Sequence, residues 1–166
     1  NDRLISPTRF HNSVHNASSG YWSISSGSMA SSSVLCGHDA SFSAGLLEAM
    51  AQVVIENKPV LLVAYDTDYP EPLHSVRPLP DSFGAALVLS PRRSANSLAE
   101  WRVSPASCFN PSEADTLSSP LLEQLRLATP AARCLPLLHS IATRQSAMIT
   151  LDYLQGMPLA VHVNPC

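Results

Sequence analysis

The 166-residue sequence predicts an α/β fold. Two continuous apolar runs, residues 60–64 and 83–90, are typical of strands that are covered on both faces. Residues 40–56 form the clearest predicted helix, because apolar residues recur there at helical spacing. A short apolar segment, residues 33–36, precedes this helix and is predicted to be a buried strand. The succession of strand, helix and strand over residues 33–66 predicts a βαβ unit, and therefore an α/β architecture.

The residues before this unit are predicted to form two short helices. The Ser-Pro pair at 6–7 is a favourable helix start, with serine as the N-cap and proline at the first helical position, so a helix is expected over residues 7–16. Residues 16–20 are small or polar and should interrupt this helix. A second helix is expected over residues 21–26.

The residues after the unit are predicted to begin with a proline-rich surface loop over residues 67–81. Near the C-terminus, apolar and polar residues alternate in two runs separated by a glycine-containing turn, which predicts a β-hairpin. The other expected elements are a strand near 101–103, helices over 119–128 and 131–143, and the hairpin strands over 147–154 and 158–164.

The composition narrows the class of protein. Hydrophobic residues make up 45% of the chain and charged residues 14%, which is too apolar for a disordered tail. Thirteen acidic and ten basic side chains give a net charge of −3, so we do not expect a partner in nucleic acid or in an anionic membrane surface. No apolar run approaches the roughly 18 residues that a transmembrane helix needs.

The cysteines and histidines give little support for a metal or another cofactor. The cysteines are far apart and lack CxxC spacing, so we expect neither a zinc site nor a disulfide framework, and a reduced, cytoplasmic setting fits best. His11 and His15 have the i, i+4 spacing of a metal-binding pair on one helix, but no third ligand accompanies them, and packing or solvent exposure is the favoured alternative. The four cysteines are Cys36, Cys108, Cys134 and Cys166.

The turn before the long helix is the first candidate for chemistry. Enzymes often place a nucleophile where a strand ends in a sharp turn at a helix N-terminus. Here the turn contains His38 and Asp39, and it lacks the Gly-x-Ser-x-Gly pattern of a serine hydrolase. Asp39 is a candidate carboxylate nucleophile or base, and the favoured alternative is an N-cap of the helix over 40–56. His38 and Asp39 are also a candidate dyad, although sequence neighbours rarely point at each other.

A second candidate site follows the predicted strand over residues 60–64. Asp66 and Asp68 come directly after this strand. In α/β folds, site residues gather at the carboxyl ends of strands. Ordinary solvation of a loop is the favoured alternative for these two carboxylates.

Two stretches of the sequence resemble a known family. Residues 6–27 are similar to the segment ahead of the nucleophile in β-ketoacyl synthases of the thiolase-like fold. Residues 39–73, with the motifs ASFSAGLLEAM, PVLLVAYD and YPEPL, resemble a narrower branch, the small stand-alone ketosynthase-like proteins of aryl polyene and xanthomonadin-type pigment clusters. The first similarity is carried by Ser6, Pro7, Ser13, Val14, Asn16, Gly20, Ile24 and Gly27.

The resemblance implies a thiolase-like half-domain with the element order βαβαβαββ and the sheet order 3-2-1-4-5. Residues 33–36, 60–66 and 83–90 would be its third, fourth and fifth strands, so its first two strands are lacking. We expect either further residues ahead of Asn1 or another chain that supplies those strands. Residues 1–166 would then be a single, N-terminally truncated domain. The family's dimer edge is the strand before the turn, which implies a homodimer through residues 33–36.

The resemblance also implies a function. In active synthases the nucleophilic cysteine stands where this chain has Asp39, whereas Cys36 lies three residues earlier, and the catalytic histidines would lie in a C-terminal half that this chain lacks. This implies a non-catalytic, chain-length-factor-like subunit in polyketide- or fatty-acid-type pigment synthesis, acting through a ketosynthase subunit or an acyl carrier protein. The candidate pocket residues are Trp22, Phe42 and Leu46. The candidate docking arginines for the acidic carrier protein are Arg3, Arg9, Arg92 and Arg93, with Arg77 as a weaker choice.

Two other interpretations stay open. A small acyltransferase or thioesterase would use Asp39 or His38, and the substitution Asp39→Asn would abolish its turnover. A plain interaction module with a degenerate thiolase-like fold would lack a ligand tunnel.

Overall fold

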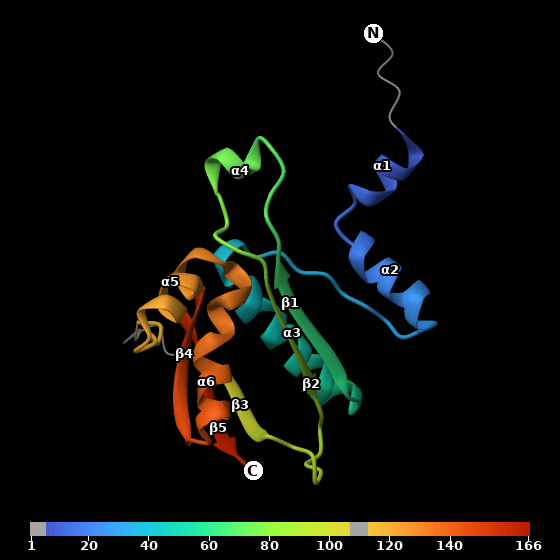
Figure 1. The fold of residues 1–166 in the computed structure, drawn as a ribbon. Helices are drawn as coiled ribbons and strands as arrows, with labels where there is room; N and C mark the ends of the chain where they lie inside the picture. The colour runs from blue at the N-terminus through green and yellow to red at the C-terminus, as the bar shows by residue number, and fades with distance from the viewer. Residues whose placement is uncertain (1–5, 107–112) are drawn as a thin grey trace. The chain divides into compact units, whose positions relative to one another are not determined.

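The structure, a computed structural model, describes residues 6–106 and 113–166 (Figure 1). The chain divides into two compact units, of which the first ends at Leu35 and the second covers Cys36–Cys166. Each unit is described by itself below. The expectation of one domain over the whole chain stays a prediction.

The first unit contains two short helices. Helix α1 (Pro7–Asn12) starts at the expected Ser-Pro pair but ends four residues before the predicted boundary, where the Ser13 hydroxyl donates a hydrogen bond to the Phe10 carbonyl at 2.7 Å. Helix α2 (Ala17–Ser26) begins inside the segment that was expected to interrupt the helices. Gly27, with a φ of +64°, ends it in the left-handed conformation that glycine adopts without strain. Among residues 6–35, no side chain is buried.

The predicted strand over residues 33–36 is wrong, and so is the βαβ unit that depended on it. Residues 31–37 have no regular secondary structure. Three serines precede a run of only three apolar residues, Val34 to Cys36, and no strand in the described part of the chain pairs with this run. A strand gains its stability from pairing and packing, which this segment lacks.

The predicted long helix is confirmed. A short 3₁₀ turn, η1 (His38–Ala40), leads into α3 (Ser41–Glu56). Asn57 adopts a left-handed φ of +51° and ends the helix just before Lys58 and Pro59. The buried residues of α3 recur at helical spacing and include Phe42, Leu46, Ala49 and Val53.

The first sheet has two antiparallel strands. Strand β1 (Val60–Asp66) pairs with β2 (Phe83–Leu89) in an unbroken register from Val60 opposite Leu89 to Asp66 opposite Phe83. The proline-rich loop between them carries one short helix, α4 (Leu73–Val76). Both strands lie where the sequence predicted them.

The second sheet has three antiparallel strands in the order β3-β5-β4. The strands are β3 (Ala99–Pro105), β4 (Ala147–Leu154) and β5 (Met157–Pro165), so the predicted C-terminal hairpin and the strand near Trp101 are confirmed. The mixed α/β class is therefore confirmed. The predicted sheet order 3-2-1-4-5 is not the order found in the described residues, because their five strands form two separate antiparallel sheets.

The long helix packs against both sheets. Helix α3 contacts strands of both sheets, and α5, η2 and α6 complete the second unit (Figure 1). The core combines Phe42 and Leu46 of α3 with Leu137 of α6 and the inward residues of β4 and β5. The bounds of the three elements are α5 (Pro120–Ala128), η2 (Pro130–Cys134) and α6 (Leu135–Thr143).

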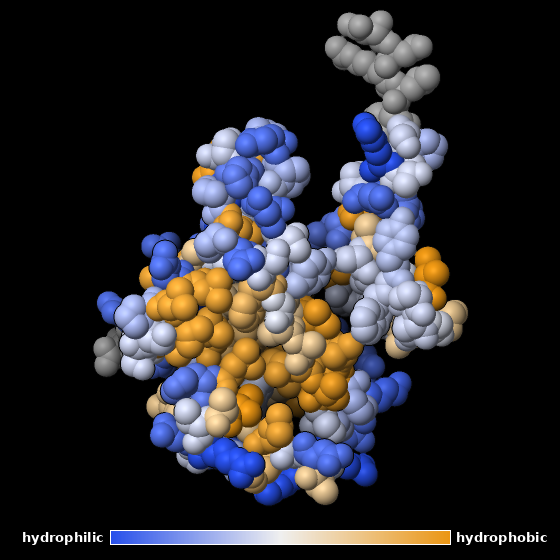
Figure 2. All heavy atoms as spheres, in the orientation of Figure 1, coloured by the Kyte–Doolittle hydropathy of each residue, from blue (hydrophilic) through white to orange (hydrophobic). Residues whose placement is uncertain are grey.

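The two sheets differ on the faces that point away from the core. The outward residues of β1 are Leu61, Val63 and Tyr65, and all three are exposed. Figure 2 shows hydrophobic residues gathered where β1, β2 and α6 lie in Figure 1. The outward residues of the second sheet include Glu100, Arg102, His162 and Asn164, which are polar or charged.

Candidate functional site

The turn before α3 is held by the hydroxyl of Ser41. This hydroxyl accepts a hydrogen bond from the Gly37 backbone N–H at 2.9 Å and donates one to the His38 carbonyl at 2.7 Å. His38 has a φ of +54°, a conformation that a residue with a Cβ adopts only at some cost. Asp39 makes no capping hydrogen bond to α3, so the prediction that it is the N-cap is wrong. The Ser41 hydroxyl orders the turn instead, and the Asp39 carboxylate is left to bind elsewhere.

The Asp39 carboxylate forms an ion pair with Arg77. The guanidinium of Arg77, at the end of α4, donates a hydrogen bond to Asp39 Oδ1 and also lies within hydrogen-bond distance of the His38 imidazole. His38 Nδ1 is 3.3 Å from Asp39 Oδ2. The structure therefore brings the predicted His38–Asp39 pair together. The sequence had suggested Arg77 only as a weak docking residue, and nothing in the spacing indicated that the proline-rich loop folds back onto the turn.

Asp66, at the end of β1, belongs to the same neighbourhood. Its Oδ2 accepts a hydrogen bond from the Ala131 backbone N–H at 2.6 Å. Burial raises the pKa of the Asp66 carboxyl, and this outweighs the lowering by the Ala131 hydrogen bond and by the positive charge of Arg77. The negative charge of Asp39 adds a smaller increase to this pKa. The second predicted site is thus joined electrostatically to the first.

Tyr69 completes a group that we name the elbow cluster, formed by His38, Asp39, Asp66, Tyr69 and Arg77. Burial raises the pKa of the Tyr69 hydroxyl, and the negative charge of Asp66 raises it further. In the cluster, Asp39 contacts the guanidinium of Arg77 directly, and the charges of Asp39 and Arg77 also affect the pKa values of Asp66 and Tyr69.

Asp68 is not part of the elbow cluster. Its Oδ1 lies 2.7 Å from His74 Nδ1 and accepts a hydrogen bond from the Tyr69 backbone N–H at 2.9 Å. Both side chains are exposed or half-exposed within the proline-rich loop. Of the two carboxylates that follow β1 in the sequence, Asp66 faces the turn and Asp68 orders the loop.

The Asp39 carboxylate of the elbow cluster is engaged by the guanidinium of Arg77. Hydrogen bonds from a guanidinium occupy the lone pairs of a carboxylate, which opposes its use as a nucleophile. The nearby imidazole of His38 is exposed and contacts the same guanidinium.

Two of the three predicted pocket residues lie in the core of the second unit, and the third lies in the first unit. Phe42 is 2% exposed and Leu46 is fully buried, and both belong to the packed core of the second unit. Trp22 lies on α2 in the first unit and is exposed. Neither of the two cavities described below is lined by any of these three side chains.

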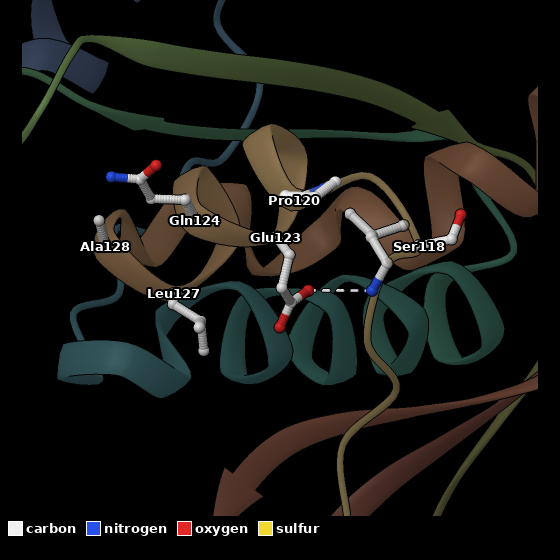
Figure 3. A pocket seen from close by; sticks show the side chains of 7 residues that line it. Ser118, Pro120, Glu123, Gln124, Leu127 and Ala128 are labelled. Carbon is white, nitrogen blue, oxygen red and sulfur yellow. Dashed lines mark hydrogen bonds between the residues drawn. The ribbon is translucent and has the colours of Figure 1, made fainter.

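The larger of these two cavities lies beside α5 and has a volume of about 610 Å³ (Figure 3). In Figure 3 the Glu123 carboxylate accepts a hydrogen bond from the Leu117 backbone N–H, at 2.9 Å. The smaller cavity, of about 350 Å³, lies at the turn between β4 and β5. No residue of the elbow cluster lines either one. The larger cavity is lined by Leu117, Ser118, Pro120, Glu123, Gln124, Leu127 and Ala128.

Glu123 also anchors α5 through an ion-pair network that the sequence analysis missed. Arg126 is almost fully buried, and its Nε and Nη2 donate to the two carboxylate oxygens of Glu123 at 2.8 and 2.7 Å. Chiefly through this hydrogen bonding, Arg126 lowers the pKa of Glu123 to about 2. Asp152 on β4 accepts a hydrogen bond from Arg133 at 2.6 Å and lies 3.7 Å from Arg126. The i, i+3 spacing of Glu123 and Arg126 was the available signal in the sequence.

The remaining sequence candidates are dispersed. His11 packs edge-to-face against Tyr21 at 5.7 Å, while His15 lies beyond the end of α1, so the proposed pair does not share one helix. Within residues 6–106 and 113–166, no three histidine, cysteine, aspartate or glutamate side chains are grouped to hold a metal ion. Across the same two ranges, no helix has the length and apolar character that crossing a membrane requires. Arg3 and Cys108 lie outside the described residues.

Comparison with known proteins identifies the family. A family model of the N-terminal domain of beta-ketoacyl synthases matches residues 1–151. The comparisons with curated proteins and with solved structures find no match. The family match covers the elbow cluster and every element from α1 to α6. The chain therefore belongs to the family of beta-ketoacyl synthase N-terminal domains.

Proposed function

We propose that this chain is a non-catalytic, chain-length-factor-like subunit that acts through a ketosynthase or an acyl carrier protein. Membership of the ketosynthase family ties it to fatty-acid- or polyketide-type biosynthesis. The observation that carries the proposal is the ion pair between Asp39 and Arg77 at the turn before α3. Resemblance to the family assigns the nucleophilic cysteine to the position of Asp39.

The chemical reason is the loss of the acyl acceptor. A condensing enzyme first takes its acyl chain onto a thiolate. The Asp39 carboxylate is engaged by Arg77 and by the contact with His38, which favours a structural use of this position. We also propose that the chain acts in an aryl-polyene-type pigment pathway. The GLLEA and VLLVAYD motifs support this part of the proposal. A cytoplasmic location is also proposed, and the unpaired thiols of Cys134 and Cys166 support it.

The test is intact mass spectrometry of the chain after incubation with an acyl carrier protein that is loaded with a malonyl or acyl group, followed by native chromatography. The expected result is a complex with no acyl adduct on the chain and no released acid. Asp39→Asn should then leave carrier binding unchanged, as should the control Asp68→Asn in the loop. An adduct or free acid that disappears in Asp39→Asn alone would overturn the proposal.

That contrary result would favour the second candidate, a small acyltransferase or thioesterase. The observation in its favour is the 3.3 Å contact between His38 Nδ1 and Asp39 Oδ2, which brings a possible base and a carboxylate together. Under this alternative, His38→Gln should also lose turnover.

Docking of an acidic carrier protein is proposed at Arg92 and Arg93, in the exposed loop that follows β2. Arg77 is excluded from this role because Asp39 engages it. The double substitution Arg92→Glu and Arg93→Glu should weaken carrier binding, and the control Arg102→Glu on the outer face of β3 should not. A dimer through residues 33–36 is not part of the proposal, because these residues form no strand.

A further inference from the structure

The larger cavity, beside α5, has no part in the proposed function. Its volume of about 610 Å³ lies within the range of small-molecule sites, which are mostly apolar and largely formed before the ligand binds. Most of its lining residues are apolar, and the side chain of Leu127 among them is 52% exposed. A ligand in this cavity would therefore cover apolar surface that is open to solvent in the described residues. The apolar lining residues are Leu117, Pro120, Leu127 and Ala128.

The ion-pair network of α5 holds the walls of this cavity in place. Glu123 Oε2 accepts one hydrogen bond from the Leu117 backbone N–H at 2.9 Å and another from Arg126 Nε at 2.8 Å. These bonds tie the segment before α5 to the helix, so both walls are fixed without a ligand. A preformed site loses less conformational entropy on binding than a site that must first become ordered.

The charges around the cavity favour an uncharged ligand. Glu123 is the one ionisable side chain among the lining residues, and both of its carboxylate oxygens accept hydrogen bonds from Arg126. Arg126 is only 4% exposed and does not line the cavity. A ligand carboxylate would therefore meet the negative charge of Glu123 without a cation to pair with. A ligand ammonium group would compete with Arg126 for oxygens that are already hydrogen-bonded.

Two uncharged polar groups can meet the head group of such a ligand. The Ser118 hydroxyl and the Gln124 amide line the cavity, and neither side chain forms a hydrogen bond with another described residue. In Figure 3 the two side chains lie at opposite ends of the labelled set. From Pro120 to Ala128 the helix axis spans about 12 Å, which suits an alkyl chain of medium length.

We propose that the cavity beside α5 binds a neutral acyl amide or ester with an alkyl chain of medium length. The alkyl chain lies along Leu117, Pro120 and Leu127, and the carbonyl oxygen of the head group accepts a hydrogen bond from the Gln124 side chain. The cavity discriminates against the free fatty acid and against the alkylamine of the same length. This inference does not depend on the proposed function, since no residue of the elbow cluster lines the cavity.

The first test compares three probes that share an eight-carbon chain, namely octanamide, octanoate and octylamine, below the concentrations at which they aggregate. In NMR titrations of the isotopically labelled chain, octanamide should shift the backbone resonances of residues 117–128. Octanoate and octylamine should bind at least about tenfold more weakly. Octanoate or octylamine binding as tightly as octanamide would overturn the proposal. So would octanamide that shifts none of these resonances.

The second test uses variants of α5. Leu127→Asp should weaken octanamide binding at least about tenfold, because it places a charge in the apolar lining. The matched control is Leu121→Asp on the same helix, which does not line the cavity and should leave binding unchanged. Both leucines are more than half exposed, so both variants are compatible with the folded chain. Equal losses in the two variants would overturn the proposed site.

The third test concerns the head group. Gln124 is exposed at the end of the cavity, so Gln124→Lys supplies a cation there without disturbing the core. The variant should bind octanoate more tightly than octanamide and so reverse the preference of the wild type. A preference for octanamide that the substitution leaves unchanged would overturn the assignment of the head group to Gln124.

Discussion

The two sheets of the second unit both pack one face against the core, but they differ in the residues on the other face. The sheet β3-β5-β4 buries Leu159, Val161 and Val163 against the core. Its outward face is mainly charged and polar, with Met148 as an exposed apolar residue. The sheet β1–β2 also packs one face on the core, but its other face is apolar. The first arrangement is complete in water, whereas the second is suited to a covered position.

The same contrast extends to the groups around each sheet. Beside the second sheet, Glu123, Arg126, Asp152 and Arg133 form a partly buried ion-pair network that fastens α5 to β4. At the end of the first sheet, the elbow cluster joins the turn before α3 to a proline-rich loop through half-exposed groups. We therefore expect the second sheet to dominate stability and the first sheet to dominate interactions.

The largest expected effect compares one leucine from each sheet. Leu159→Ala on β5 removes a fully buried side chain and should lower the free energy of unfolding by about 2–5 kcal/mol. Leu61→Ala on the outward face of β1 should cost less than about 1 kcal/mol in the monomer, because the side chain is exposed there. Urea unfolding of both variants at low protein concentration measures the difference. Equal losses would mean that the outward face of β1 is already buried, and the comparison would fail.

The next largest effect concerns Glu123. Its pKa in the folded chain is about 2, against 4.5 for the unperturbed group, so its contribution to stability is present above pH 4.5 and is lost as the pH falls toward 2. That contribution amounts to about 3 kcal/mol at neutral pH. Glu123→Gln should lower stability at pH 7 and remove this part of the acid dependence. Urea unfolding at pH 7, 4.5 and 3 tests it, and an unchanged pH profile in the variant would contradict the role of the network.

The sequence predicted the elements that depend on local patterns. The helical spacing in α3, the apolar runs of β1 and β2 and the alternation in β4 and β5 were sufficient to find these elements. It failed at residues 33–36, where a short apolar run has no partner strand in the described residues. The prediction that β1 is covered on both faces is wrong for the described residues, because Leu61, Val63 and Tyr65 on its outward face are exposed.

The candidate site was predicted in part. The sequence singled out His38, Asp39 and Asp66, and the structure brings them into one cluster. Sequence reasoning predicted the wrong partner for Asp39. The Ser41 hydroxyl forms the hydrogen bonds that order the turn before α3, and Asp39 does not cap the helix. Sequence reasoning also did not anticipate Arg77 as the partner, since 38 residues and a proline-rich loop separate the two in the chain.

A smaller effect is expected at Asp66, where the sign is opposite to that of Glu123. Burial raises the pKa of Asp66, so the folded state favours its protonated form. The stability that this form provides is present below the unfolded pKa of 3.8. It is lost as the pH rises through the pKa of the folded state. Asp66→Asn keeps an oxygen that accepts the Ala131 hydrogen bond and removes the charge. Relative to the wild type, the variant should therefore gain stability as the pH rises from 3 to 7. If the difference in unfolding free energy between variant and wild type stays constant with pH, burial does not raise the pKa of Asp66.

The smallest effect on stability is expected at Arg77, because its ion pair with Asp39 is about one-third exposed. Arg77→Met should change the free energy of unfolding by less than about 1 kcal/mol, since ion pairs that water reaches contribute little. The same substitution removes the contact between the proline-rich loop, which carries α4, and the turn before α3, so the loop should become more mobile. Hydrogen exchange of residues 67–81 should then become faster, while exchange in β4 and β5 stays unchanged. A loss of stability as large as that of Leu159→Ala would instead make the elbow cluster part of the structural core and remove the distinction between the two sheets.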